Sequence, residues 1–301
     1  MTVLAVVGPT AAGKSALSIA LAHALDGEVV NADSMQLYRG MDIGTAKLTS
    51  DEREGVPHHL LDIWEVAEPA SVAEYQRMAR AAVDDILARG RVPLLVGGSG
   101  LYIRAVLEEF EFPGTDPQVR ARLEAELATV GPAPLYDRLR IADPVAAERI
   151  LPSNGRRIVR ALEVIEVTGA PFTAALPQPT PFYSFVQIGV DLDTELLDER
   201  IAVRVARMWA AGLVDETRGL VERGLRSGRT ASRALGYQQV LRFLSGEISE
   251  AEAYEETIRA TRRFVRRQRS WFRRAPQVVW LDAARADLVP AALTAFAVGR
   301  E

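Results

Sequence analysis

Eight consecutive residues near the start of the chain have the types and the spacing of a phosphate-binding loop. They read Gly8-Pro9-Thr10-Ala11-Ala12-Gly13-Lys14-Ser15 and fit the pattern G-x4-G-K-[S/T]. In such a loop the glycines let backbone N–H groups point at an oxyanion, the lysine adds a positive charge, and the serine hydroxyl can bind Mg²⁺. A glycine turn that binds nothing is the competing interpretation. We expect this loop to bind a nucleotide or a pyrophosphate.

A second polar cluster, Asp33-Ser34-Met35-Gln36, follows the apolar run 28–31. A carboxylate beside a pyrophosphate site can act as a general base or bind a metal ion, although Asp33 could instead only cap a helix. Kinases and nucleotide hydrolases usually hold Mg²⁺ with an acid near a second strand. Here the apolar run 94–96 leads into Gly97-Gly98 instead. A kinase or hydrolase therefore stays an alternative, but a disfavoured one.

The elements that must position these residues alternate along the chain. Apolar runs predict strands over 4–7, 28–31 and 93–96, and helical spacing predicts helices over 15–25 and 71–89. Such alternation is typical of a parallel sheet, whose strand ends collect ligand sites at one edge. We predict an α/β fold, a P-loop core with a central parallel sheet flanked by helices, and a second glycine turn at 97–100 on the same edge.

From about residue 112 the sequence pattern changes, and it predicts an all-helical insertion domain. Helical patterns cover 117–129, 133–141, 144–150 and 154–168, and prolines at 171, 177, 179 and 181 mark a linker. Further strands are predicted over 185–190 and 278–281. The predicted domains are 1–112, the first part of the core; 113–184, the insertion; and 185–301, the second part of the core with basic C-terminal helices.

Composition narrows the class of protein. The 301 residues include no cysteine, which excludes disulfides and cysteine-based zinc sites. No apolar run approaches the roughly 20 residues of a membrane span, and the chain enters its first predicted strand at once. We expect a cytoplasmic protein with no signal peptide and no membrane association. His58 and His59 could be catalytic, but neither has a metal-ligand partner at helical spacing, so a catalytic histidine is a disfavoured alternative. We expect His23, in the first predicted helix, to be structural.

The formal net charge of −4 argues against a nucleic-acid partner, but its distribution does not. Eight arginines and no acid lie between Arg259 and Arg274. On a helix, Arg259, Arg262, Arg263, Arg266, Arg269 and Arg273 share roughly one face. This face either meets RNA phosphates, or is solvated and paired with the upstream glutamates at 250–256. Trp271, inside the stripe, either packs in the protein or stacks on a base.

Seven motifs in order resemble the bacterial tRNA dimethylallyltransferases, which prenylate the adenine next to the anticodon. They are GPTAAGKS (8–15), ADSMQLYRGMDIGTAK (32–47), PHHLLD (57–62), GGSGLY (97–102), RALEV (160–164), ALGYQQV (234–240) and TRRFVRRQRSWFRR (261–274). The resemblance spans nearly the whole chain. It implies dimethylallyl diphosphate and the tRNA anticodon stem-loop as substrates and Mg²⁺ as cofactor, and we expect a monomer.

The resemblance also implies roles for individual residues. The loop 8–15 would hold the diphosphate, with Mg²⁺ on Ser15, and Asp33 would take the proton from the adenine N6. Lys14, Ser99 and Arg200 would complete the catalytic set. The implied tRNA contacts are Asp33, Ser34, Met35, Gln36, Ser99, Arg120, Arg156, Arg157, Ile158, Val159 and Arg160. The insertion would close over the anticodon stem-loop.

The chain departs from the family at one of these places. The family usually reads N-D-x-Q-R before the RALEV motif, whereas this chain has Ser153-Asn154-Gly155-Arg156-Arg157. The details of that tRNA contact therefore differ here. A P-loop-derived RNA-binding module without catalysis is the second alternative, but Lys14, Ser15 and Asp33 argue against it, because a mere binder needs no general base beside a diphosphate.

Overall fold

The structure, a computed structural model, describes residues 2–110, 112–172 and 180–300. Contacts divide the chain into two units: a core unit, Met1–Glu108 with Pro181–Glu301, and a helical unit, Glu109–Thr180. The predicted boundaries lie four residues later at both junctions. The difference arises because Glu108 pairs with Pro181 and Phe182 N donates to Leu107 O at 2.8 Å, which ties 181–184 to the core. Pro177 and Pro179 of the predicted linker lie outside the described residues.

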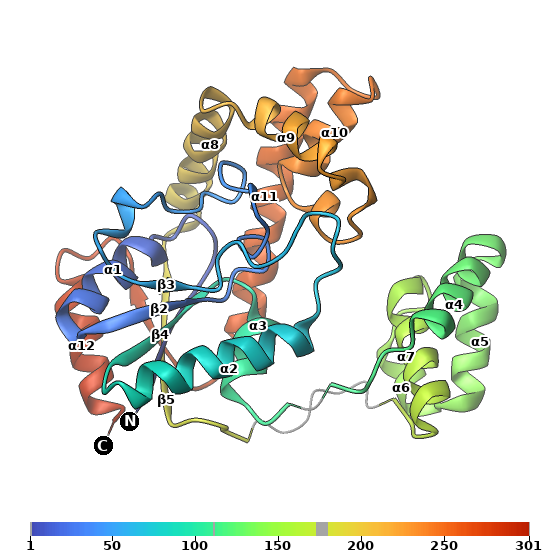
Figure 1. Ribbon diagram of the computed structural model, residues 1–301, viewed down its shortest axis with the longest axis horizontal. Coiled ribbons are helices and arrows are strands. Elements are labelled where there is room, and N and C mark those ends of the chain that lie inside the picture. The colour runs from blue at the N-terminus through green and yellow to red at the C-terminus, as the bar shows by residue number, and fades with distance from the viewer. Residues whose placement is uncertain (1, 111, 173–179, 301) are drawn as a thin grey trace. The chain divides into compact units, whose positions relative to one another are not determined.

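The core unit is built on a six-stranded sheet in the order β3-β2-β4-β1-β5-β6, with every neighbouring pair parallel (Figure 1). The strands are β1 (Val3–Val7), β2 (Gly27–Asn31), β3 (His58–His59), β4 (Val92–Gly97), β5 (Phe185–Asp191) and β6 (Val278–Asp282). The predicted α/β fold is confirmed. The two-residue edge strand β3 was not predicted, because it is too short to give an apolar run.

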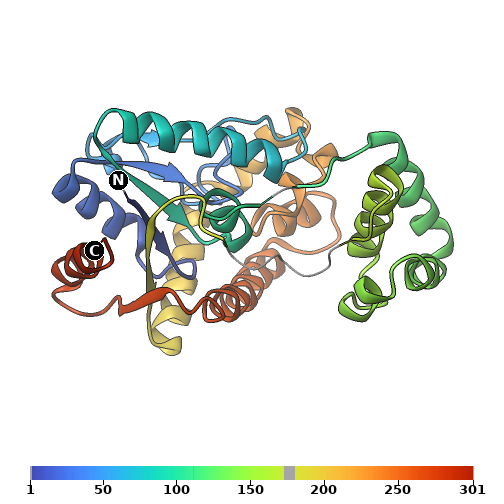
Figure 2. The ribbon, with the colours of Figure 1, turned by 90° about the horizontal axis from the view of Figure 1, so that it is seen from below.

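Helices cover both faces of this sheet (Figure 2). Val3, Ala5 and Val7 of β1 face a cluster that includes α2 and α3, whereas Leu4 and Val6 face a cluster that includes α1, α8 and α12. Both faces are buried, so β1 is apolar at every position. The helices are α1 (Lys14–Leu25), α2 (Val72–Ala88), α3 (Gly100–Leu107), α8 (Thr194–Ala210), α9 (Leu213–Glu222), α10 (Tyr237–Leu244), α11 (Glu250–Phe272) and α12 (Leu288–Val298). Short 3-10 turns are Asp51–Arg53, Leu225–Ser227 and Ala231–Arg233.

The helical unit packs four helices around a small core of its own. They are α4 (Pro117–Val130), α5 (Pro132–Ala142), α6 (Pro144–Arg149) and α7 (Gly155–Thr168), each within one residue of its predicted bounds. Asp116, Asp143 and Asn154 accept backbone N–H groups at the starts of α4, α6 and α7. Such caps fix where a helix begins, which explains why the sequence predicted these bounds well.

Candidate active site

The P-loop lies at the carboxyl end of β1 and leads directly into α1. Gly8 has φ +138°, and a Cβ there would lie 2.2 Å from the Val190 carbonyl oxygen, so no other residue fits. Lys14 Nζ donates to the Pro9 carbonyl at 2.8 Å. The second glycine turn lies beside this loop, since a Cβ on Gly98 would lie 3.3 Å from the Gly8 carbonyl oxygen. The predicted convergence of the two glycine turns on one sheet edge is confirmed.

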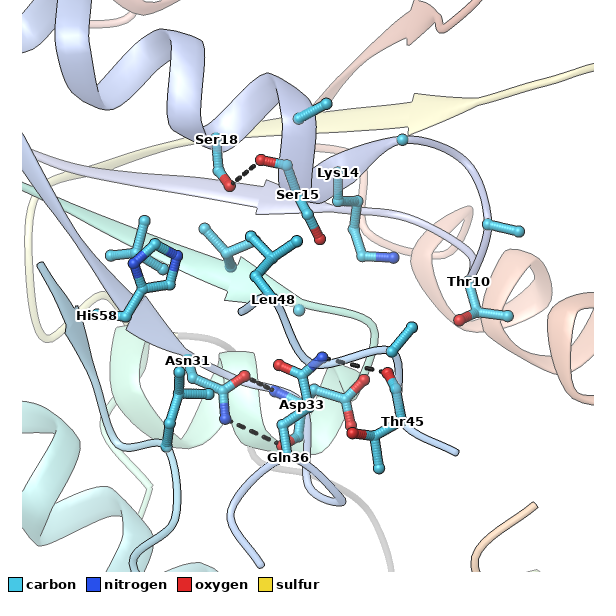
Figure 3. Close-up of a pocket in the computed structure, with 18 of the residues that line it drawn as sticks. Thr10, Lys14, Ser15, Ser18, Asn31, Asp33, Gln36, Thr45, Leu48 and His58 are labelled. Atoms are coloured by element: carbon cyan, nitrogen blue, oxygen red, sulfur yellow. Dashed lines mark hydrogen bonds between the residues drawn. The ribbon is translucent and has the colours of Figure 1, made fainter. Parts of the chain in front are cut away.

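A cavity of about 230 Å³ opens beside this loop. Figure 3 shows Lys14 and Ser15 facing it from the P-loop, and Asp33, Gln36 and Thr45 facing it from the opposite side. The cavity therefore brings together predicted site residues from two segments: Lys14 and Ser15 of the P-loop, and Asp33 and Gln36. Its wall also includes the following residues: Thr10, Ala11, Gly13, Ala16, Ser18, Val29, Asn31, Ala46, Leu48, His58, Leu61, Val96, Gly97 and Arg204.

Asp33 is held by its neighbours with one carboxylate oxygen left over. Asn31 Oδ1 accepts from Asp33 N at 2.9 Å, and Asn31 Nδ2 donates to the Asp33 and Leu60 carbonyls. Asp33 Oδ1 accepts from Met35 N at 3.1 Å. Residues 34–37 form turns, so Asp33 does not cap a helix. No hydrogen bond from a described residue reaches Oδ2, which leaves this oxygen able to accept a proton or bind a metal ion.

The charges around the cavity favour an anion. Burial lowers the pKa of Lys14 to about 8; the Asp33 carboxylate raises it, and the Arg204 guanidinium lowers it further. Burial also lowers the pKa of Arg204, against the raising effect of Asp33. Two cations and one carboxylate thus share the cavity. An anionic ligand would offset the mutual repulsion of the two cations and raise the pKa of Lys14 again.

The arginine of this cavity is Arg204, which corrects the expected Arg200. Arg204 donates to the Thr45 carbonyl at 3.0 Å and lines the cavity. Arg200 is exposed and does not line it. Both side chains project from the same side of α8, one turn apart, so the sequence contained the signal for Arg204 but not the means to choose between the two arginines.

The segment 36–47, part of the motif at 32–47, forms one wall of the cavity through Gln36, Thr45 and Ala46. Gln36 Nε2 donates to the Thr45 carbonyl at 3.3 Å. Glu216 of α9 accepts from the backbone N–H groups of residues 42–44, and the buried Lys47 pairs with Asp42 and Asp62, each at 2.6 Å. These contacts join residues far apart in the sequence, and no local pattern predicts them.

Ser99 and Ser34 lie together at the start of α3. Ser34 N donates to Ser99 Oγ at 3.4 Å, and Ser99 Oγ donates to Ser34 Oγ at 3.3 Å. Neither serine lines the cavity. The second glycine turn therefore contacts the segment that contains Asp33, without contributing the Ser99 hydroxyl to the cavity wall.

The predicted tRNA contacts in the helical unit lie in three different environments. Ile158 and Val159 are buried in the core of the unit, so their side chains do not face a ligand. Arg120 and Arg160 both donate to the buried Glu163, and Arg160 also donates to the Pro113 carbonyl at 2.7 Å. Arg156 and Arg157 are exposed in the first turn of α7. The motif predicted a contiguous contact segment, whereas a helix returns to the same inward face only every third or fourth residue.

The arginines of α11 lie on two faces of the helix, whereas most of them were expected to share one face. Arg262 and Arg266 lie 3.5 and 3.9 Å from Asp198, and Arg269 and Arg273 lie 2.8 and 3.7 Å from Asp191. The partners of this face are thus acids at the end of β5 and the start of α8. Of the upstream glutamates at 250–256, only Glu255 lies near a stripe arginine, 3.9 Å from Arg259, within the described residues. A separate face exposes Arg263, Arg267, Trp271 and Arg274.

No described helix is long and apolar enough to cross a membrane. Among the residues that the structure describes, no group of three or more histidine, cysteine, aspartate or glutamate side chains is arranged to hold a metal ion.

Comparison with known proteins places the chain in a family. The model of the IPP transferase family matches residues 36–275. A tRNA dimethylallyltransferase of Salinispora arenicola is 82% identical over 294 residues, covering 98% of this chain and 86% of that protein. The crystal structure of a tRNA isopentenylpyrophosphate transferase from Bacillus halodurans has 41% identity and a TM-score of 0.73, covering 99% of this chain and 95% of that one.

A eukaryotic dimethylallyltransferase acting on tRNA has a similar structure, with a TM-score of 0.83 and 26% identity. The similarity covers 97% of this chain and 77% of the eukaryotic chain. The family match covers most of the chain, and the relatives are similar over nearly all of it. The chain is therefore a transferase that belongs to the IPP transferase family.

Proposed function

We propose that this enzyme transfers the dimethylallyl group of dimethylallyl diphosphate to N6 of the adenine next to the tRNA anticodon, position 37, and releases diphosphate. The names of its relatives support the reaction class. A cavity that holds a P-loop and a carboxylate on facing walls supports the chemistry. The C1–O bond of the allylic substrate breaks, an N6–C1 bond forms, and the N6 proton goes to a base.

The diphosphate would lie against the P-loop. Displacement at an allylic carbon needs a good leaving group, and pyrophosphate becomes one when fixed positive charge absorbs the charge that develops on it. Lys14 of α1 and Arg204 of α8 supply two such charges. Both are partly desolvated, which strengthens their attraction for an anion.

Mg²⁺ fits this site as an ion carried with the diphosphate. Ser15 lines the cavity, so its hydroxyl is available as a hard ligand, and the diphosphate oxygens would supply others. When bound, the ion would neutralise part of the charge on the leaving group. The free oxygen of Asp33 is then left for the proton of the acceptor.

Asp33 would act as the base. The exocyclic amine of adenine is a poor nucleophile, because its lone pair is delocalised into the ring, and a carboxylate that accepts its proton assists attack. The Oδ2 atom of Asp33 is available for this proton. The target base must leave its stack to reach the cavity, which is easiest in a loop such as the anticodon loop. A carboxylate facing a P-loop across one cavity is the observation that carries this proposal.

The rest of the tRNA would meet the exposed face of α11. Arg263, Arg267 and Arg274 supply phosphate contacts there, and Trp271, 38% exposed, offers an aromatic surface. The enzyme would act as a monomer. The enzyme would meet its tRNA in the cytoplasm.

A thermal-shift comparison tests the substrate. Dimethylallyl diphosphate with Mg²⁺ should raise the melting temperature more than an equal concentration of ATP with Mg²⁺, since a ligand at 100 times its Kd stabilises by about 2.7 kcal/mol. Incubation with tRNA should then yield prenylated tRNA and free diphosphate. Stronger stabilisation by ATP, with phosphate release, would identify a kinase or hydrolase instead. Stabilisation by tRNA alone would identify an RNA-binding module.

A further inference from the structure

The side-chain amide of Gln268 joins the two glycine turns of the active-site edge. Its Oε1 accepts the backbone N–H of Thr10, in the P-loop, at 2.9 Å. Its Nε2 donates to the carbonyl of Gly98, in the second turn, at 2.9 Å. Gln268 is 7% exposed, and a Cβ on Gly98 would lie 2.3 Å from Nε2. One buried side chain of α11 therefore fixes the spacing between the ends of β1 and β4.

Adjacent residues fix α11 itself to the same edge. Arg269 donates to Asp191 Oδ1 at 2.9 Å and to Thr194 Oγ1 at 2.8 Å, at the end of β5 and the start of α8. Trp271 packs against Gly100, where an added Cβ would lie 1.8 Å from Nε1. The helix that carries Gln268 is thus anchored on both sides of it, and the amide has little freedom to leave its two partners.

We propose that Gln268 is a positioning residue that holds the P-loop in its diphosphate-binding shape before the diphosphate arrives. The inference rests on the proposed function of the loop. Because Gln268 satisfies the Thr10 N–H, the loop needs no ligand to keep this arrangement. Without the amide, the diphosphate would have to order the loop as it binds, and that ordering entropy would weaken its affinity.

Gln268 lies inside the run of arginines between 259 and 274, where the sequence indicated roles for the charges and for Trp271 but none for this amide. On the helix, Gln268 lies on the buried side together with Val265 and Phe272, opposite to the exposed face that contains Arg263 and Arg267. One helix thus has an outer face of cations and an inner face that holds the P-loop.

The variant Gln268→Met tests the inference, because it preserves volume but removes both hydrogen bonds. Titration with inorganic diphosphate and Mg²⁺ should show affinity about tenfold weaker than wild type, as expected for the loss of a hydrogen bond to a buried backbone group. Affinity for tRNA should change less than about twofold on the same criterion. The matched control is Thr261→Val, which removes a buried side-chain hydrogen bond from the same helix and should leave diphosphate affinity unchanged.

A second variant, Gln268→Glu, separates positioning from packing. Its carboxylate still accepts the Thr10 N–H but cannot donate to Gly98, and it adds a negative charge near the diphosphate site. Protonation restores the donor, so diphosphate affinity should recover toward the wild-type value as the pH is lowered, when each pH is compared with wild type. Because a buried carboxylate also destabilises the fold until it is protonated, affinity is compared only at pH values where the melting temperature shows the variant to be folded.

The outcomes distinguish the inference from the function on which it rests. Failure of the wild-type protein to bind diphosphate would overturn the proposed function. Normal wild-type binding, together with unchanged affinity in folded Gln268→Met, would overturn the role of Gln268 alone. Should Gln268→Met fail to fold, Gln268→Glu decides: a pH profile parallel to that of wild type would reject the positioning role.

Discussion

The two units use their charged residues in opposite ways. In the core unit, Lys14, Asp33 and Arg204 face a shared cavity, and their charges are available to a ligand. In the helical unit, Arg120 and Arg160 are bound to the buried Glu163, so the charges expected to meet tRNA stabilise the unit itself. A charged residue in a family motif can therefore mark either a ligand contact or an internal support. The difference depends on what lies opposite it.

The largest expected effect concerns Asp33, whose carboxylate faces the cavity of the core unit. Asp33→Asn keeps the shape and hydrogen-bonding capacity of the side chain but removes its proton affinity. Single-turnover prenylation should fall by about 10²–10⁴, while binding of diphosphate and tRNA survives. Lys14→Ala is the contrasting variant and should weaken diphosphate binding as well as the chemical step, because its charge acts on ground and transition states alike. A near-normal rate in Asp33→Asn would show that Asp33 is not the general base.

The two arginines of α8 form a matched pair within the core unit. Arg204→Ala should weaken diphosphate binding by roughly 10- to 100-fold, since a charge-assisted hydrogen bond is lost from a desolvated site. Arg200→Ala, one turn away and exposed, should change it by less than about threefold on the same reasoning. Isothermal titration with diphosphate and Mg²⁺ measures both. A larger effect at Arg200 would show that Arg200, and not Arg204, contacts the leaving group.

Glu163→Gln tests the internal role of the arginines in the helical unit. It should destabilise this unit by about 1–3 kcal/mol, because two guanidinium groups lose their charged partner, and leave diphosphate affinity unchanged. Burial acts to raise the pKa of Glu163, but its bonds to Arg120 and Arg160 outweigh burial and hold the pKa below its usual value. The ion pairs therefore stabilise the wild-type unit above about pH 4, and this contribution is lost as the pH falls through the lowered pKa.

Thermal unfolding followed across pH measures the effect of Glu163. The wild-type protein should lose stability on acidification relative to Glu163→Gln, so the difference between the two should shrink. An unchanged melting temperature in the variant, with a loss of tRNA affinity, would show instead that Arg120 and Arg160 act on RNA.

The smallest expected effect concerns the two faces of α11. Arg263→Gln should flatten the plot of log tRNA affinity against log salt by roughly 0.7–0.9, as expected for one lost phosphate contact. Arg262→Gln, its neighbour on the face that pairs with Asp198, should leave the slope unchanged. Filter binding of tRNA at several salt concentrations provides the slopes. The reverse result would place the RNA on the other face of the helix.

The sequence predicted the sheet and the P-loop well, because both are encoded locally. Apolar runs specify buried strands, and only glycine, which has no Cβ, fits at position 8 beside Val190. The sequence did not predict which arginines face a ligand. Asp191 and Asp198 lie more than sixty residues before the arginines that they bind, so the charge run on α11 seemed unpaired. The choice between Arg200 and Arg204 likewise depended on how α8 packs.

The junction between the units has a consequence for folding. Glu108 pairs with Pro181, and Glu109 N donates to the Thr180 carbonyl at 2.8 Å, so the two ends of the helical unit lie side by side. Closing a flexible loop costs entropy that grows with its length. Once the helical unit has folded, its paired ends make the long connection between β4 and β5 behave as a short one. The order in which the two units fold can then set the rate at which the central strands meet.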